Sequence, residues 1–110
     1  MSRVKFYLLL CILGVGFFGI SQAASFDCKK ASTKIEKTIC LDRELNNLDL
    51  AIDNAYKSLL KQHPIPEYVK ARQADWQELN LLCDEANLKS CLQNSFTSRL
   101  EQLAWSNSTL

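Results

Sequence analysis

The chain has 110 residues, with 13 lysine and arginine residues against 12 aspartate and glutamate residues, and its formal net charge is +1. This length is that of one domain. The nearly balanced charge argues against a polyanion such as nucleic acid, or an anionic membrane, as the main partner.

The first 23 residues have the pattern of a signal peptide. Two basic residues near the start precede an uncharged apolar run over residues 6–20, and the small residues Ser21 and Ala23 then mark a cleavage point after Ala23. The run is shorter than the roughly 20 residues that span a membrane, which disfavours a retained anchor. We therefore expect residues 24–110 to form the mature domain, periplasmic or secreted, with no stable membrane anchor after cleavage.

The cysteines predict disulfide bonds. Cys11 lies in the apolar run, so four cysteines remain in the mature chain: Cys28, Cys40, Cys83 and Cys91. An even number in a short exported chain is typical of a disulfide framework that supplements a modest core. A metal site is disfavoured because the chain has no C-x-x-C pair and His63 is its one histidine. We expect no metal or cofactor. Neither Cys11 nor Cys28 follows the small residues that usually precede a lipidated cysteine.

The mature chain is predicted to be helical from its first element onward. All three glycines lie in the first 23 residues, so the mature domain lacks the residue best suited to tight hairpin turns. Ser32 or Thr33 can cap a short helix that ends near Cys40, and Glu36 would complete a capping box with Thr33. Asp42 can cap a longer helix that reaches about Gln62.

Two further helices follow the prolines. Pro66 suits the first turn of a helix that runs to about Cys83, and residues 84–87 form a short connection to the last helix, which begins near Leu88. Apolar residues recur at spacings of three and four, and we assign these positions to the core: Leu45, Leu48, Ile52, Ala55, Tyr56, Leu59, Val69, Trp76, Leu79, Cys83, Leu88, Leu92, Phe96, Leu100 and Leu103. Short loops imply antiparallel neighbours. We predict an all-α fold, a small disulfide-stapled antiparallel bundle of three long helices and a short N-terminal helix.

Two arginines fall inside these apolar stripes. At about 100° per residue, Arg72 and Arg99 each lie on an apolar face. An arginine held against a core needs a carboxylate, so we expect both to be partly buried in structural ion pairs with Asp49 or Glu36. The alternative is that the arginines point outward and bind an anionic ligand.

Acidic residues line one edge of the second helix's apolar stripe. These are Asp42, Asp49 and Asp53. If Asp49 serves the core, Asp42 and Asp53 remain as a candidate surface for a protein partner. The chain has no second histidine, nucleophile elbow or phosphate-binding glycine loop, so we expect no enzymatic activity and no catalytic residues.

The cysteine blocks resemble a known family. Residues 25–33 and 35–40 are similar to the opening of the LprI-like lysozyme inhibitor N-terminal domain. The resemblance continues to about residue 103 through Leu45, Leu48, Asp49, Ala55, Tyr56, Gln73, Trp76, Cys83, Cys91, Arg99, Leu100 and Leu103. It implies a small exported bacterial protein, with lysozyme inhibition as the activity of the founding type.

Two functions follow from this resemblance and the absence of catalytic groups. The first is a periplasmic binding protein that inhibits lysozyme or a related wall hydrolase. The alternative is an envelope structural or interaction module without a hydrolase target. Four cysteines allow three pairings. We expect the local one, Cys28–Cys40 and Cys83–Cys91, which ties the N-terminal segment to the first helix and joins the third and fourth helices.

Overall fold

The computed structural model describes residues 24–110, so the predicted signal peptide and its cleavage point lie outside the described residues. This part of the chain is helical, without a strand, which confirms the predicted all-α fold. In chain order the elements are the 3-10 turn η1 (Cys28–Lys30), α2 (Lys34–Leu41), α3 (Arg43–Gln62), α4 (Pro66–Asn80), the 3-10 turn η2 (Glu85–Asn87) and α5 (Leu88–Ser108).

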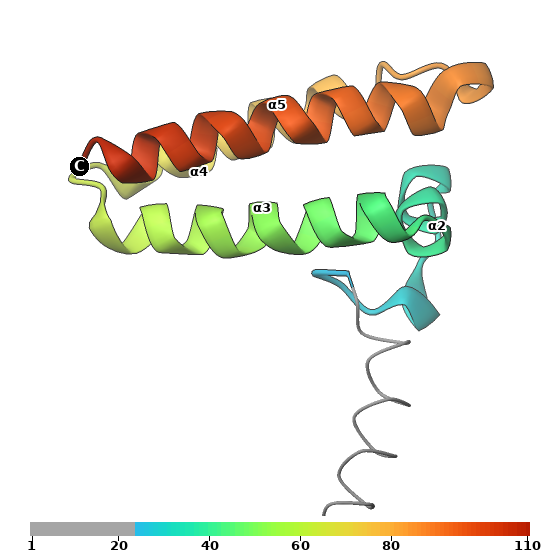
Figure 1. The fold of residues 1–110 in the computed structure, drawn as a ribbon, viewed down its shortest axis with the longest axis horizontal. Helices are drawn as coiled ribbons and strands as arrows, with labels where there is room; N and C mark the ends of the chain where they lie inside the picture. The colour runs from blue at the N-terminus through green and yellow to red at the C-terminus, as the bar shows by residue number, and fades with distance from the viewer. Residues whose placement is uncertain (1–23) are drawn as a thin grey trace, which may run out of the picture.

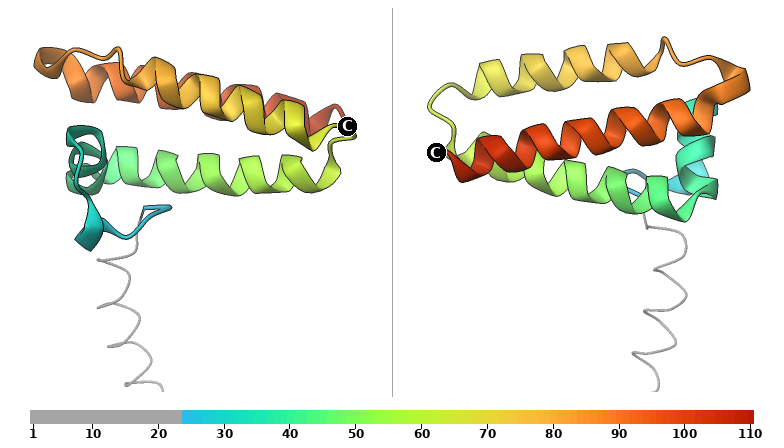
Figure 2. Two further views of the ribbon diagram at one scale, coloured as in Figure 1. Left: turned by 180° about the vertical axis from the view of Figure 1, so that it is seen from behind. Right: turned by 45° about the horizontal axis from the view of Figure 1, so that its top comes forward.

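The three long helices form an up-down-up bundle. In Figure 1, α3 runs toward the end marked C, α4 returns behind α5, and α5 runs in the direction of α3, while α2 crosses the other end. The two further views in Figure 2 show the same arrangement. α5 packs most extensively against α3, which makes this pair the centre of the bundle.

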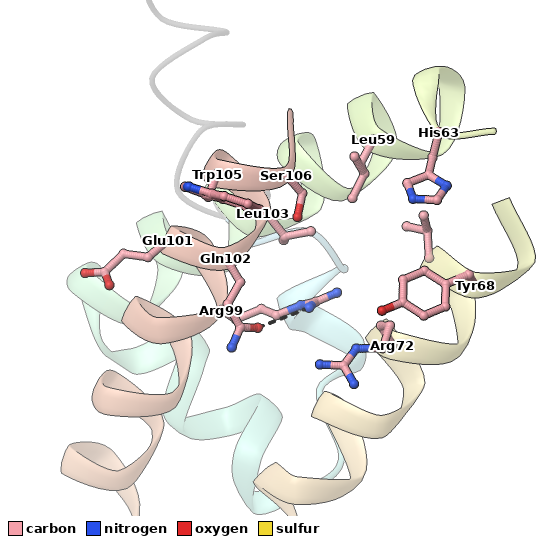
Figure 3. Close-up of a pocket in the computed structure, with 11 residues that line it drawn as sticks. Leu59, His63, Tyr68, Arg72, Arg99, Glu101, Gln102, Leu103, Trp105 and Ser106 are labelled. Atoms are coloured by element: carbon pink, nitrogen blue, oxygen red, sulfur yellow. Dashed lines mark hydrogen bonds between the residues drawn. The ribbon is translucent and has the colours of Figure 1, made fainter. Parts of the chain in front are cut away.

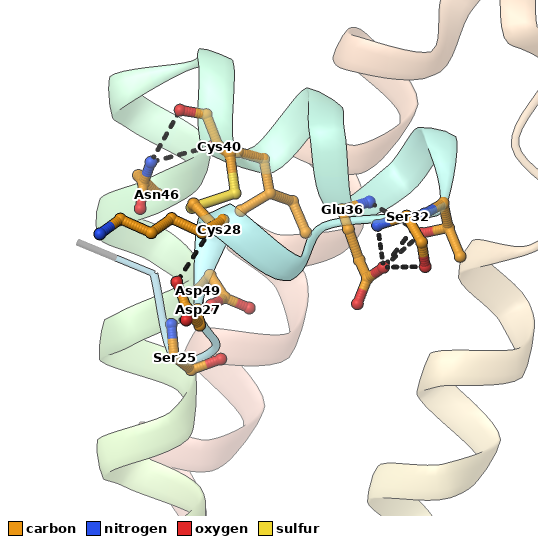
Figure 4. The surroundings of a disulfide bond; sticks show 11 residues. Ser25, Asp27, Cys28, Ser32, Glu36, Cys40, Asn46 and Asp49 are labelled. Carbon is orange, nitrogen blue, oxygen red and sulfur yellow. Dashed lines mark hydrogen bonds between the residues drawn. A yellow bond between two sulfur atoms is a disulfide. The ribbon is translucent and has the colours of Figure 1, made fainter. Parts of the chain in front are cut away.

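The N-terminal segment is held by a cap and a disulfide (Figure 4). Thr33 Oγ1 accepts a hydrogen bond from the Glu36 amide at 3.1 Å, and Glu36 Oε1 accepts one from the Thr33 amide at 3.1 Å. This is the predicted capping box, which satisfies two amides that lack partners inside the helix. Cys28 and Cys40 are bonded, with their Cα atoms 5.8 Å apart. The bond ties η1 to the last turn of α2.

The corner between α2 and α3 depends on two polar side chains. Asp42 ends α2 and caps α3, where its Oδ1 accepts a hydrogen bond from the Leu45 amide at 3.1 Å. Asn46 is buried, and its Nδ2 donates to the carbonyls of Ile39 and Cys40 at 3.1 and 3.3 Å. These carbonyls lie at the end of α2, where helix carbonyls lack the amide partner of a continuing helix, although that of Ile39 also accepts a long hydrogen bond from the Asp42 amide at 3.4 Å. Asn46 therefore fixes the angle between the two helices.

The core lies between α3, α4 and α5. Its most deeply buried side chains are Leu45, Ile52, Leu92, Phe96 and Leu103. The rings of Trp76 and Phe96 pack at a tilt of 55° with centroids 5.1 Å apart. Trp76 Nε1 donates to Ser95 Oγ at 2.9 Å, so the partly buried indole has its polar group satisfied.

The end of α4 differs from the prediction. The helix ends at Asn80 rather than near Cys83, and Leu79, predicted to be core, is 61% exposed. The buried face of α4 instead includes the amides of Gln73 and Asn80, because both find partners on α5: Gln73 accepts from Arg99, and Asn80 accepts from the Ser95 hydroxyl. Cys83 lies beyond the helix and is bonded to Cys91, with Cα atoms 5.8 Å apart.

Candidate functional site

The acidic edge of α3 is less available for binding a protein partner than the sequence suggests. Asp42 Oδ2 forms an ion pair with Lys89 Nζ of α5 at 2.8 Å, and the aspartate side chain is only 12% exposed. Asp53 Oδ2 pairs with Lys57 Nζ at 2.8 Å. Asp49 Oδ2 accepts a hydrogen bond from a backbone amide of the N-terminal segment. The lysines offset much of the charge that would attract a cationic partner, so Asp42 and Asp53, the candidate surface for a protein partner, carry less uncompensated negative charge than the sequence suggests.

The corner held by Asp42 should be sensitive to acid. The hydrogen bond from Lys89, and then the Leu45 amide, hold the pKa of Asp42 below its ordinary value of 3.8. A carboxyl whose pKa is depressed by folding stabilises the folded state above the unfolded pKa, and this contribution is lost as the pH falls through the folded pKa. We therefore expect the melting temperature to fall with acidification below about pH 4, and Asp42→Asn to flatten that dependence.

Thermal melts followed by circular dichroism across this range would measure the effect. Asp75→Asn is the matched control, because Asp75 is exposed and makes no ion pair among residues 24–110. Part of the acid dependence should remain in Asp42→Asn, since backbone amides of Ser32 and Thr33 also lower the pKa of Glu36. An unchanged pH profile in Asp42→Asn would contradict the role given to this carboxylate.

The predicted arginine ion pairs are not formed within residues 24–110. Arg99 is buried as expected, but Arg72 is exposed, and neither pairs with a carboxylate in this part of the chain. The two carboxylates expected to pair with the arginines instead accept hydrogen bonds from backbone amides. Glu36 accepts one from the Thr33 amide in its capping box, and Asp49 accepts one from the Ser25 amide at 2.7 Å. Both carboxylates thus hold the N-terminal segment instead of an arginine.

Arg99 is bound by amide oxygens. Its Nε donates to Gln73 Oε1 at 3.0 Å and its Nη1 to Gln102 Oε1 at 3.3 Å, while the residue is only 6% exposed. Burial, and then the charge of Arg72, lower the pKa of Arg99. Both causes act against the charged form of the guanidinium. No carboxylate of residues 24–110 forms an ion pair with Arg99 or Arg72, so their positive charge is not neutralised within this part of the chain.

A pocket opens beside these arginines (Figure 3). Its volume is about 480 Å³, within the range of small-ligand sites. The pocket lies where α3 ends, α4 begins and α5 nears its last turn, and we call it the arginine pocket. Its lining includes Leu59, Tyr68, Arg72, Arg99, Leu103 and Trp105. In Figure 3, Arg99 and Arg72 extend toward each other from α5 and α4. Glu101 also lines the pocket, but its side chain points away from Arg99.

Exposed aromatic side chains flank the arginine pocket. Tyr68 is 56% exposed and Trp105 is 70% exposed. The ring of Tyr68 stacks on that of His63 with centroids 5.8 Å apart, and His63 Nδ1 accepts a hydrogen bond from the Ile65 amide at 2.9 Å. His63 therefore stabilises the turn between α3 and α4.

The sequence interpretation missed how these residues come together. Gln73 could have been found, because it shares the spacing of Val69, Trp76 and Asn80 on one face of α4. Tyr68 and Trp105 carry no such signal, since they lie on different helices and come to line one pocket only when α4 and α5 pack.

The arginine pocket is the part of the described residues that we consider for ligand binding. Within residues 24–110, no cluster of three or more histidine, cysteine, aspartate or glutamate side chains is arranged to hold a metal ion. The four cysteines of this part are all in disulfides. None of its helices combines the length and apolar character needed to cross a membrane. The arginine pocket presents guanidinium groups and apolar walls, which can bind an anion attached to an apolar group.

Comparison with known proteins relates the chain to Lipoprotein LprI. The chain is 33% identical over 81 residues to Lipoprotein LprI of Mycobacterium bovis and to Lipoprotein LprI of Mycobacterium tuberculosis. The aligned region is 73% of this chain but 41% of the relative, so the chain spans about two fifths of the length of these curated relatives. No protein-family model matches the chain, and no solved structure does. The predicted resemblance to LprI-like proteins is confirmed by this alignment, over 73% of the chain.

Proposed function

We propose that this chain, of which 73% aligns with Lipoprotein LprI, is an exported protein that inhibits lysozyme or a related wall hydrolase by binding to the hydrolase. In this proposal residues 1–23 are a cleaved signal peptide, and the domain acts in the periplasm or outside the cell. It turns over no substrate.

The similarity to LprI is the observation that carries the proposal. The cysteine blocks of the sequence resemble the LprI-like lysozyme inhibitor domain, and the 81-residue alignment with Lipoprotein LprI agrees with that resemblance. The disulfides Cys28–Cys40 and Cys83–Cys91 suit an oxidising compartment, where such bonds form and persist. Wall hydrolases are found in the same compartments.

We place the contact with the hydrolase at the end of the bundle around Tyr68, Arg72 and Trp105, which we call the aromatic end. Tryptophan, tyrosine and arginine are the residues most enriched among those that dominate binding energy at protein interfaces. All three are exposed here. Lysozymes carry a pair of carboxylates in their cleft, and arginine is well suited to bind a carboxylate. The competing contact surface is formed by Asp42 and Asp53, each of which is paired with a lysine.

The test is a wall-lysis assay with several lysozyme types and the purified, disulfide-bonded protein. We expect inhibition by the parent protein, and a loss of about 30-fold in inhibitory potency in Trp105→Ala, as for a residue worth about 2 kcal/mol at an interface. Asp53→Lys is the matched variant on the competing surface and should inhibit like the parent, because the proposed contact lies at the aromatic end and not at Asp53 and its partner Lys57.

Circular dichroism of both variants would show that the helices are retained. Loss of inhibition in Asp53→Lys but not in Trp105→Ala would move the contact to the acidic edge of α3. Full hydrolase activity in excess parent protein, for every lysozyme type tried, would refute the inhibitor proposal and leave an envelope interaction module.

A further inference from the structure

Positive charge is concentrated in the arginine pocket without a matching negative charge. Arg99 is 6% exposed, and its two hydrogen-bond partners are neutral amide oxygens on Gln73 and Gln102. Arg72 lines the same pocket and makes no ion pair within residues 24–110. Buried charges are normally paired, because removing a charge from water is costly. The folded domain thus holds two guanidinium groups, those of Arg72 and Arg99, to which an external anion can bind.

The other walls of the pocket indicate which anion fits. Leu59, Val69 and Leu103 give it an apolar floor, which would be a poor environment for a small, strongly hydrated dianion such as phosphate. A carboxylate carries a single charge and is matched by the planar fork of a guanidinium. An apolar group attached to that carboxylate would displace water from the exposed rings of Tyr68 and Trp105, which line the same pocket.

We propose that the arginine pocket is a binding site for a carboxylate that is attached to an apolar group. Arg99 and Arg72 bind the carboxylate, and the exposed rings of Tyr68 and Trp105 contact the apolar group. Free organic acids and the carboxyl terminus of a peptide with an apolar last residue share this chemistry. The inference goes beyond hydrolase inhibition and does not depend on it, because the ligand here is a small group that enters the pocket rather than a protein surface.

The experiment compares acids with their amides. The purified, disulfide-bonded protein is titrated with N-acetyl-leucine and with a tripeptide that ends in leucine, and each titration is repeated with the C-terminal amide of the same compound. Calorimetry or chemical-shift changes report the affinity. We expect both acids to bind at least about tenfold more tightly than their amides, since a charged hydrogen-bonded pair is typically worth more than 1.4 kcal/mol. Tighter binding of the tripeptide than of N-acetyl-leucine would point to a peptide terminus as the source.

Variants of the arginines locate the site. Arg72→Met should weaken binding of the acids about tenfold and leave binding of the amides unchanged. Arg72 is exposed, so this variant should fold; Arg99→Met should have a larger effect if it folds. Arg43→Met is the matched control, because Arg43 is also exposed and lines a different surface at the start of α3.

The inference fails if acid and amide bind equally, or if Arg72→Met and Arg43→Met weaken binding equally. Inorganic phosphate that binds as tightly as the acids would also overturn it, because the apolar group would then contribute nothing. None of these results depends on whether a lysozyme is inhibited, so the two proposals can fail separately.

Discussion

Phe96→Ala should lower the free energy of unfolding by about 3–5 kcal/mol. Phe96 is 2% exposed on α5 and packs against the ring of Trp76. Truncation to alanine removes most of the buried ring and leaves a cavity between α4 and α5, which the bundle can fill only partly. Urea unfolding followed by circular dichroism would measure the loss.

Leu79→Ala is the control for Phe96→Ala. The helical spacing of the sequence predicts that both residues are core, but the structure exposes Leu79 at the end of α4. Surface substitutions of this kind usually change stability by less than about 0.5 kcal/mol. Comparable losses in the two variants would mean that Leu79 is buried in solution, and that α4 packs with a different face toward α5.

Replacing both Cys28 and Cys40 with serine should lower the free energy of unfolding by about 2–3 kcal/mol in the absence of reductant. The bond closes a loop between residues 12 apart in the sequence and attaches the N-terminal segment to α2. Without it, the unfolded chain regains the conformational freedom that the closed loop removes. Chemical denaturation of the serine variant and the parent, side by side, gives the difference.

The second disulfide provides an internal comparison. Cys83 and Cys91 are 8 residues apart, so replacing both with serine should cost a few tenths of a kcal/mol less by the loop-closure argument. A Cys28→Ser/Cys40→Ser variant as stable as the parent would show that the capping box, together with the hydrogen bond from Ser25 to Asp49, holds the N-terminal segment without the covalent bond.

The positions of the helices could be predicted from the sequence because local interactions set them. Thr33 and Glu36 cap α2, Asp42 caps α3, and Pro66 occupies the first turn of α4, as their side chains and spacing indicate. Each of these contacts joins residues only a few positions apart, so no knowledge of the packed bundle is needed. The same locality makes the pairing of neighbouring cysteines predictable.

The partners of the polar side chains were decided only by tertiary structure. Sequence spacing placed Arg99 on a buried face, but it could not show that Gln73 would reach it from α4 while Asp49 and Glu36 bonded to backbone amides. These choices depend on the rotation of α4 against α5, which also exposes Leu79 and brings Arg72 beside Arg99. The arginine pocket is formed by side chains from three helices, so it exists only once those helices have packed.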